Sequence, residues 1–121
     1  MASPNIVNVA TIRGNTNVAT LGATSGNIVT NAASSGKVFK INTVILSNFD
    51  GTTAYDATLT LYSARAGATK NLVSTVSVPA DASLIVIDKT TAIYMEEGDI
   101  IAGLASAASK IDVTISYEDI S

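Results

Sequence analysis

Side chains alternate between apolar and polar along much of the chain, and this period of two constrains the fold more than any other feature. In the segment 57–62 every second residue is apolar or small, and the residues between them are Thr or Tyr. The segments 7–12 and 111–117 alternate in the same way. Because successive side chains of a strand point to opposite faces, this pattern is typical of half-buried strands.

Further strands are expected where β-branched residues cluster. The segment 73–78 ends at Pro79, and the short apolar runs 44–46 and 84–87 predict strands that are buried on both faces. Turn-forming groups rich in Gly, Asn and Asp separate these segments, and no apolar stripe with a period of 3.6 residues extends over ten residues. The chain is therefore predicted to be all-β, an antiparallel β-sandwich or jelly roll of about eight short strands.

The 121 residues suit one domain, because single domains have roughly 100–150 residues. Within residues 1–35, the stretch from Asn5 to Ala33 has no charged side chain except Arg13. An uncharged stretch rich in Thr and Asn is prone to aggregate when it is not paired. We therefore interpret residues 1–35 as an N-terminal arm or edge-strand region of a single domain spanning 1–121, pairing with its own sheet or a neighbour's.

Composition excludes several classes of function. The chain has no Cys and no His, so a Ser-His-Asp triad, a thiolate nucleophile and a zinc-thiolate site are impossible, and no cofactor is expected. Seven Lys and Arg against ten Asp and Glu, with no basic cluster, argue against nucleic acid as a partner. No run approaches the ~18 apolar residues of a membrane span, and the segment 1–5 lacks the pattern of a signal peptide. Synthesis in the cytoplasm and no membrane contact are expected.

Carboxylates are the remaining candidates for catalysis. Glu96, Glu97 and Asp99 flank Gly98, and two acids can act as a pair in glycoside hydrolysis. Adjacent residues on a strand face opposite ways, however, and the glycine indicates a turn. A solvated corner is the favoured interpretation, and we predict that the protein is not an enzyme.

The residues around Gly51 include candidate ligands for a metal ion. Asn48, Asp50 and Asp56 supply oxygen atoms that could hold calcium, but their spacing differs from that of an EF-hand loop. A turn with positive φ at the glycine is favoured, and no metal is predicted.

The charged fraction of 14% is low for a soluble domain, in which about 25% is usual. A surface of Ser, Thr and Asn can be covered by another protein at a low desolvation cost. This favours either a subunit packed against neighbours or a secreted or particle-borne protein. Interface candidates are Arg13 and Arg65, which can bind carboxylates bidentately, and Tyr62 and Tyr117, which we assign to the polar side of their strands.

The segments 1–7, 29–42, 94–99 and 116–118 resemble small all-β virion proteins of tailed phages of marine bacteria, cyanophages especially, and are most like capsid decoration (cement) proteins. Such proteins sit on the outer capsid, often as trimers. The resemblance implies a structural protein of the virion, located on the capsid surface. The implied partners are the major capsid protein and identical subunits in a homo-oligomer, with a trimer favoured.

The expected mechanism is mechanical, with edge strands and the N-terminal region bridging adjacent capsid subunits. Two alternatives remain. A tail or head-fibre module would bind a host receptor or glycan, although six aromatic residues are few for that purpose. A small hydrolase would need two acids within ~5–10 Å of each other.

Overall fold

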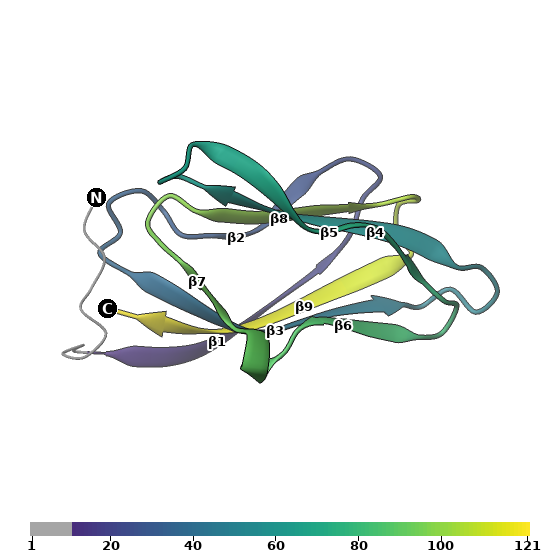
Figure 1. The fold of residues 1–121 in the computed structure, drawn as a ribbon. Coiled ribbons are helices and arrows are strands. Elements are labelled where there is room, and N and C mark those ends of the chain that lie inside the picture. Colours follow the sequence, from purple (N-terminus) through teal and green to yellow (C-terminus); the bar gives the residue numbers. More distant parts are fainter. Residues whose placement is uncertain (1–10) are drawn as a thin grey trace.

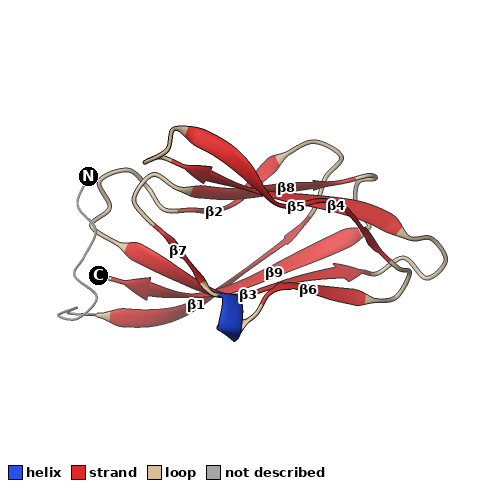
Figure 2. Ribbon diagram, in the orientation of Figure 1, coloured by secondary structure: helices blue, strands red, loops and turns tan. Residues whose placement is uncertain are grey.

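The computed structural model describes residues 11–121. These residues form nine strands and one short 3-10 helix, η1 (Figures 1 and 2). In chain order the elements are β1 (Ile12–Thr20), β2 (Gly26–Thr30), β3 (Val38–Asn48), β4 (Tyr55–Ser63), β5 (Ala68–Val78), β6 (Ser83–Ile87), η1 (Lys89–Thr91), β7 (Ile93–Met95), β8 (Ile100–Ala105) and β9 (Ile111–Ile120).

The strands form two antiparallel sheets that pack face to face (Figure 1). Sheet A has the order β1-β9-β3-β6, and the short β7 pairs with β3 as well. Sheet B has the order β2-β8-β4-β5. No helix within residues 11–121 has the length and apolar character needed to cross a membrane.

The pairing is nested along the chain. β1 pairs with β9, β2 with β8, β3 with β6 and β7, and β4 with β5. The first half of the chain therefore runs antiparallel to the second half as one long hairpin. Rolling this hairpin adds the pairs β3–β9 and β4–β8, which gives the topology of a jelly roll. The prediction of an all-β sandwich is confirmed, with nine strands in place of about eight.

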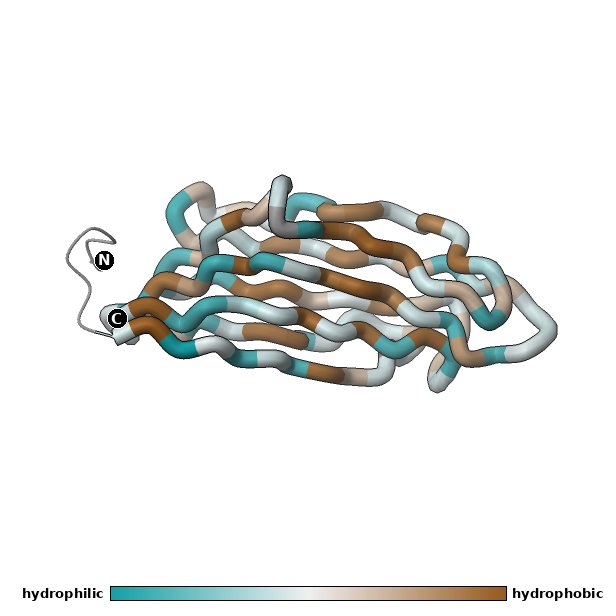
Figure 3. The backbone as a smooth tube through the Cα atoms, turned by 90° about the horizontal axis from the view of Figure 1, so that it is seen from below, coloured by the Kyte–Doolittle hydropathy of each residue, from teal (hydrophilic) through white to brown (hydrophobic). Residues whose placement is uncertain are grey.

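The core lies between the sheets and is built by the alternation seen in the sequence. Every second residue of β9 is fully buried, at Ile111, Val113 and Ile115, and the residues between them face outward. Apolar and polar stretches are interspersed along the tube in Figure 3, and the alternation is strictest in β4 and β9. Burial of these aliphatic side chains supplies most of the stability, at about 1.5–3 kcal/mol each.

The runs 44–46 and 84–87 are not buried on both faces, contrary to the prediction. Ile85 is 62% exposed, and Ile45 is half-buried. Both residues lie on the outer side of sheet A, where the two-layer sandwich has no third layer to cover them. In these two strands, therefore, a continuous apolar run indicates one face that is buried in the core and one apolar face that is exposed.

Residues 11–35 belong to the sandwich. They form β1 at an edge of sheet A and β2 at an edge of sheet B. The assignment of residues 1–35 to an arm or edge-strand region stays a prediction. Residues 1–10 lie outside the described residues, as does most of the predicted strand 7–12.

Candidate interaction surface

The outer face of sheet A has a row of aliphatic and threonine side chains that crosses four strands. Val18 of β1 is opposite Thr114 of β9, Thr114 is opposite Ile45 of β3, and Ile45 is opposite Ile85 of β6. We call these four residues the aliphatic row. Its two ends are well exposed, with Val18 at 73% and Ile85 at 62% of their full accessible surface. Directly opposed residues lie about 4.5–5.5 Å apart, so the row is a continuous strip.

A row of hydroxyl groups runs beside the aliphatic row. The Thr20 hydroxyl donates to an Asp112 carboxylate oxygen at 2.6 Å, and the Ser47 and Ser83 hydroxyls lie 3.1 Å apart. These groups bond to one another within the sheet, so a partner that covers them does not leave them without hydrogen bonds. Burying such groups costs far less than burying free charges.

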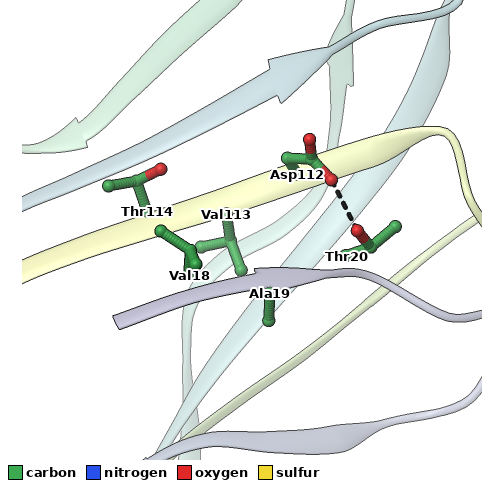
Figure 4. A pocket seen from close by; sticks show the side chains of 6 residues that line it. All are labelled: Val18, Ala19, Thr20, Asp112, Val113 and Thr114. Atoms are coloured by element: carbon green, nitrogen blue, oxygen red, sulfur yellow. Dashed lines mark hydrogen bonds between the residues drawn. The ribbon is translucent and has the colours of Figure 1, made fainter. Parts of the chain in front are cut away.

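A shallow hollow of about 360 Å³ lies where β1 and β9 meet (Figure 4). It is lined by Val18, Ala19, Thr20, Asp112, Val113 and Thr114. Asp112 is the one titratable residue of this lining, and it already accepts a hydrogen bond from Thr20. The lining of this hollow therefore contains no pair of acids for hydrolysis.

The structure places the predicted interface residues on different parts of the molecule. Arg13 is exposed on β1, opposite Asp119, whose carboxylate binds Lys37 at 3.3 Å. Tyr62 is 36% exposed on the outer face of sheet B, and Arg65 lies in the β4–β5 turn, where it binds Glu96. Arg13 is thus on the other sheet from Tyr62 and Arg65, and these residues do not form one site.

The assignment of Tyr117 to the polar side of its strand is wrong. Its side chain is 8% exposed, and its ring lies 4.8 Å from that of Phe39 in the core. Tyr117 is an even number of residues from the buried Ile111 and Ile115, so it shares their side of β9. Counting the alternation from Ile111 identifies this position as buried.

The corner at residues 96–99 is not solvated, and that prediction is also wrong. Glu97 is 2% and Asp99 5% exposed. The two carboxylate oxygens of Asp99 accept hydrogen bonds from the backbone N–H groups of Ala64 and Glu96, both at 2.9 Å. With both oxygens bonded in this way, Asp99 holds the β4–β5 turn against the corner.

Asn31 completes this buried cluster. Its side-chain amide donates to the carbonyls of Lys37 and Met95, at 2.9 and 3.2 Å. One oxygen of Glu97 accepts from the Gly36 N–H at 2.9 Å, and its other oxygen has no hydrogen-bond partner among the described residues. The cluster joins the β2–β3 loop to the β7–β8 corner, where sequence reasoning expected only a surface turn.

The loop at Asp50 is a turn, but Gly51 does not have the positive φ that the sequence predicted. One oxygen of Asp50 accepts from the backbone N–H groups of Thr52 and Thr53, and the other binds Lys110 at 3.0 Å. These contacts tie the two ends of the loop to Asp50 and to Lys110. Among residues 11–121, no group of three or more acidic residues is arranged to hold a metal ion.

The same contacts shift two pKa values. The Thr52 N–H and then the Lys110 ammonium hold the pKa of Asp50 well below its ordinary value of 3.8. The hydrogen bond to Asp50 raises the pKa of Lys110 above 10.5. Both shifts favour the charged forms, so this ion pair is intact at neutral pH.

Comparison with known proteins supports the fold alone. No protein-family model matches the chain, and no curated protein matches it. One solved structure with a similar fold is a subunit of Bacillus endospore appendages, which are described as a novel family of disulfide-linked pili. The two chains are 18% identical, with a TM-score of 0.54, and the match covers 92% of this chain and 87% of the other. This chain has no Cys and so cannot form a disulfide.

Proposed function

We propose that the protein is a structural, non-catalytic subunit of a virion that decorates the capsid and stabilises its shell. The observation that carries the proposal is the outer face of sheet A, with its exposed aliphatic row and its bonded hydroxyl groups. The resemblance of the sequence to capsid decoration proteins is the reason for proposing a phage capsid as the particle. The jelly-roll topology is compatible with this proposal by analogy, because jelly rolls are frequent among capsid proteins.

The distribution of charge supports a surface that is covered by neighbours. On the outer face of sheet A, the aliphatic row contains no charged residue, and Asp112 beside it is bonded to Thr20. Lys40 and Glu118 lie on the same face, opposite each other and toward the other end of β3 and β9. A partner that covers only the aliphatic row and the hydroxyl groups beside it therefore removes few charges from water, which keeps the cost of association low.

The mechanism is stabilisation by mass action. A protein that binds the assembled shell and not its separated subunits adds RT ln(1 + [L]/Kd) of stability at each site, about 2.7 kcal/mol when its free concentration is 100 times Kd. Many such sites on one shell oppose its rupture. The mechanism requires a rigid body with a complementary face, which a sandwich with an uninterrupted core supplies.

A subunit of a filament is the second candidate, favoured by the structural neighbour from a pilus. In that case the protein would associate with copies of itself and would not need a capsid. Purified protein examined by negative-stain electron microscopy distinguishes the two, because a pilus-like subunit forms filaments without other components.

Co-sedimentation with phage capsids stripped of the protein, in expanded and unexpanded form, tests the proposal. We expect saturable binding to expanded capsids, at a stoichiometry set by the capsid lattice. The variant Ile85→Lys places a charge in the aliphatic row and should weaken binding at least tenfold. Thr69→Lys, at an exposed position of sheet B, is the matched control and should bind normally.

Absence of binding to both capsid forms contradicts the proposal. Binding to host cells or glycans in that case would indicate the tail or head-fibre alternative. Equal loss of binding in the two lysine variants would show that the capsid does not contact sheet A in particular.

A further inference from the structure

The four outermost strand edges of the sandwich differ in how well they are protected against pairing with another chain. β2 and β6 have five residues each, and each lies beside an irregularity in its ladder, while β7 has three residues. β5 is long, but its register with β4 shifts twice, Thr75 has a φ of +51°, and Lys70 is exposed. Short strands, bulges and lysines are devices that keep sheet edges apart.

β1 has none of these devices along most of its length. Its nine residues pair with β9 in an unbroken register from Ile12 to Thr20, and Arg13 near its start is its one charged residue. Its other side pairs with no strand among the described residues. A long, regular and nearly uncharged edge is a template for a further strand.

The hydrogen bonds of β1 show which backbone groups face this open side. Thr11 and Ser121 exchange two backbone hydrogen bonds, and the Leu21 N–H donates to Ile111. Bonded pairs alternate with non-bonded pairs in an antiparallel ladder, so the odd-numbered residues of β1 point their N–H and C=O groups at β9. The even-numbered residues point theirs to the open side; these are Ile12, Gly14, Thr16, Val18 and Thr20.

We propose that β1 pairs with β1 of a second copy of this chain, antiparallel, about a two-fold axis at Thr16. This register brings Thr16 opposite the partner's Thr16, Gly14 opposite the partner's Val18, and Ile12 opposite the partner's Thr20. It is the antiparallel register that pairs all five open residues of both copies. Each pair exchanges two hydrogen bonds, so about ten form, and the two copies of sheet A become one continuous sheet.

Charge does not oppose this pairing. Arg13 is opposite the partner's Ala19, and the two arginines are about 20 Å apart along the ribbon, from a rise of about 3.4 Å per residue. That separation exceeds the Debye length of about 10 Å at 0.1 M salt, so their repulsion is screened. The contact is isologous and closes as a dimer, which differs from the trimer that the resemblance implies.

Cysteine cross-linking tests the register, because the chain has no Cys of its own. In the proposed dimer the Cα atoms of the two Thr16 residues lie about 5.5 Å apart, within the range that a disulfide spans. Thr16→Cys should therefore form a covalent dimer under mild oxidation. Val18→Cys and Thr20→Cys are matched controls at exposed positions, and their own copies lie about 14 and 27 Å apart along the ribbon. They should remain monomeric.

A proline variant tests the hydrogen bonds. Thr16→Pro removes an N–H that points away from β9, so the monomer should still fold. The dissociation constant of the dimer, measured by analytical ultracentrifugation, should rise at least tenfold. Thr16→Ala keeps the N–H and should dimerise normally. Circular dichroism establishes that each variant is folded, and the cysteine variants remain decisive if the proline variant is not.

Wild-type protein that stays at 12.3 kDa up to millimolar concentration would overturn the inference. So would equal cross-linking of the three cysteine variants, which indicates random collision. The inference is independent of the proposed function, since the dimer is measured without capsids and capsid binding is measured separately.

Discussion

Gly103 offers a sharp test of how closely neighbouring strands of sheet B pack on its inner face. It lies on β8, opposite Leu59 of β4, and faces the core. A Cβ atom at this position would lie 2.5 Å from Cδ2 of Leu59, 3.1 Å from the carbonyl oxygen of Thr58 and 3.2 Å from Cδ1 of Ile28. Leu59 is fully buried, so it has little room to move.

The cost of Gly103→Ala follows from two opposing effects. Overpacking of a core costs about 1–3 kcal/mol. Replacing glycine by alanine in a strand returns about 0.5–1 kcal/mol, because the unfolded chain loses conformational freedom. We expect the free energy of unfolding to fall by about 1–2 kcal/mol, which lowers Tm by roughly 3–10 °C in a domain of this size.

Urea denaturation and thermal melting measure this difference. Gly26→Ala is the matched control, because a Cβ there meets nothing within 4 Å and the backbone φ is not positive, so its stability should be unchanged or slightly higher. In the background of Leu59→Ala, the second substitution at Gly103 should cost much less, giving a favourable coupling of about 1–2 kcal/mol. A Gly103→Ala variant as stable as wild type, or a loss that persists fully in that background, would refute the reasoning.

Three further predictions concern the ion pair, the buried cluster and the core tyrosine. The pKa of Asp50 lies below its ordinary value of 3.8, and the pKa of Lys110 lies above its ordinary value of 10.5. The ion pair therefore contributes its full stabilisation at pH values between 3.8 and 10.5. The Tm difference between wild type and Asp50→Asn should therefore shrink as the pH falls below about 3.8 or rises above about 10.5; a difference independent of pH would contradict this. Asn31→Ala leaves the buried carbonyl of Met95 without its side-chain donor and should cost about 1–3 kcal/mol in urea denaturation, and an unchanged midpoint would show that the cluster is not stabilising. Tyr117→Ala should cost about 3–5 kcal/mol and Tyr117→Phe less than about 1.5, as expected for a core residue; the opposite order would point to a role of the hydroxyl group.

Much of the fold could be predicted from local pattern, because a strand with one buried face must alternate. That logic identified the strands at 57–62 and 111–117 as well as the all-β class. It failed at Ile85, where an apolar run was interpreted as burial on both faces. Alternation does not report whether a third layer of structure covers a strand, and in a two-layer sandwich none does.

The candidate surface could not be predicted in the same way. Val18, Ile45 and Ile85 are far apart in the sequence, and each lies on the outer side of a different strand. They form one row only because the registers of β1, β3, β6 and β9 align them across the sheet. Register depends on long-range pairing and on irregularities such as the one between Ile41 and Thr43, and local propensity contains no information on either.

By itself, the sequence determined the class of fold, the absence of thiol and imidazole chemistry, and a surface of low charge, because these follow from residue types and their spacing. Tertiary structure alone decided that Glu97 and Asp99 are buried, that Arg13 on β1 and Arg65 in the β4–β5 turn belong to different parts of the molecule, and that β1 is the long unprotected edge. The physical reason is that burial and proximity arise from pairing between distant segments, here the nested pairs from β1 with β9 to β4 with β5.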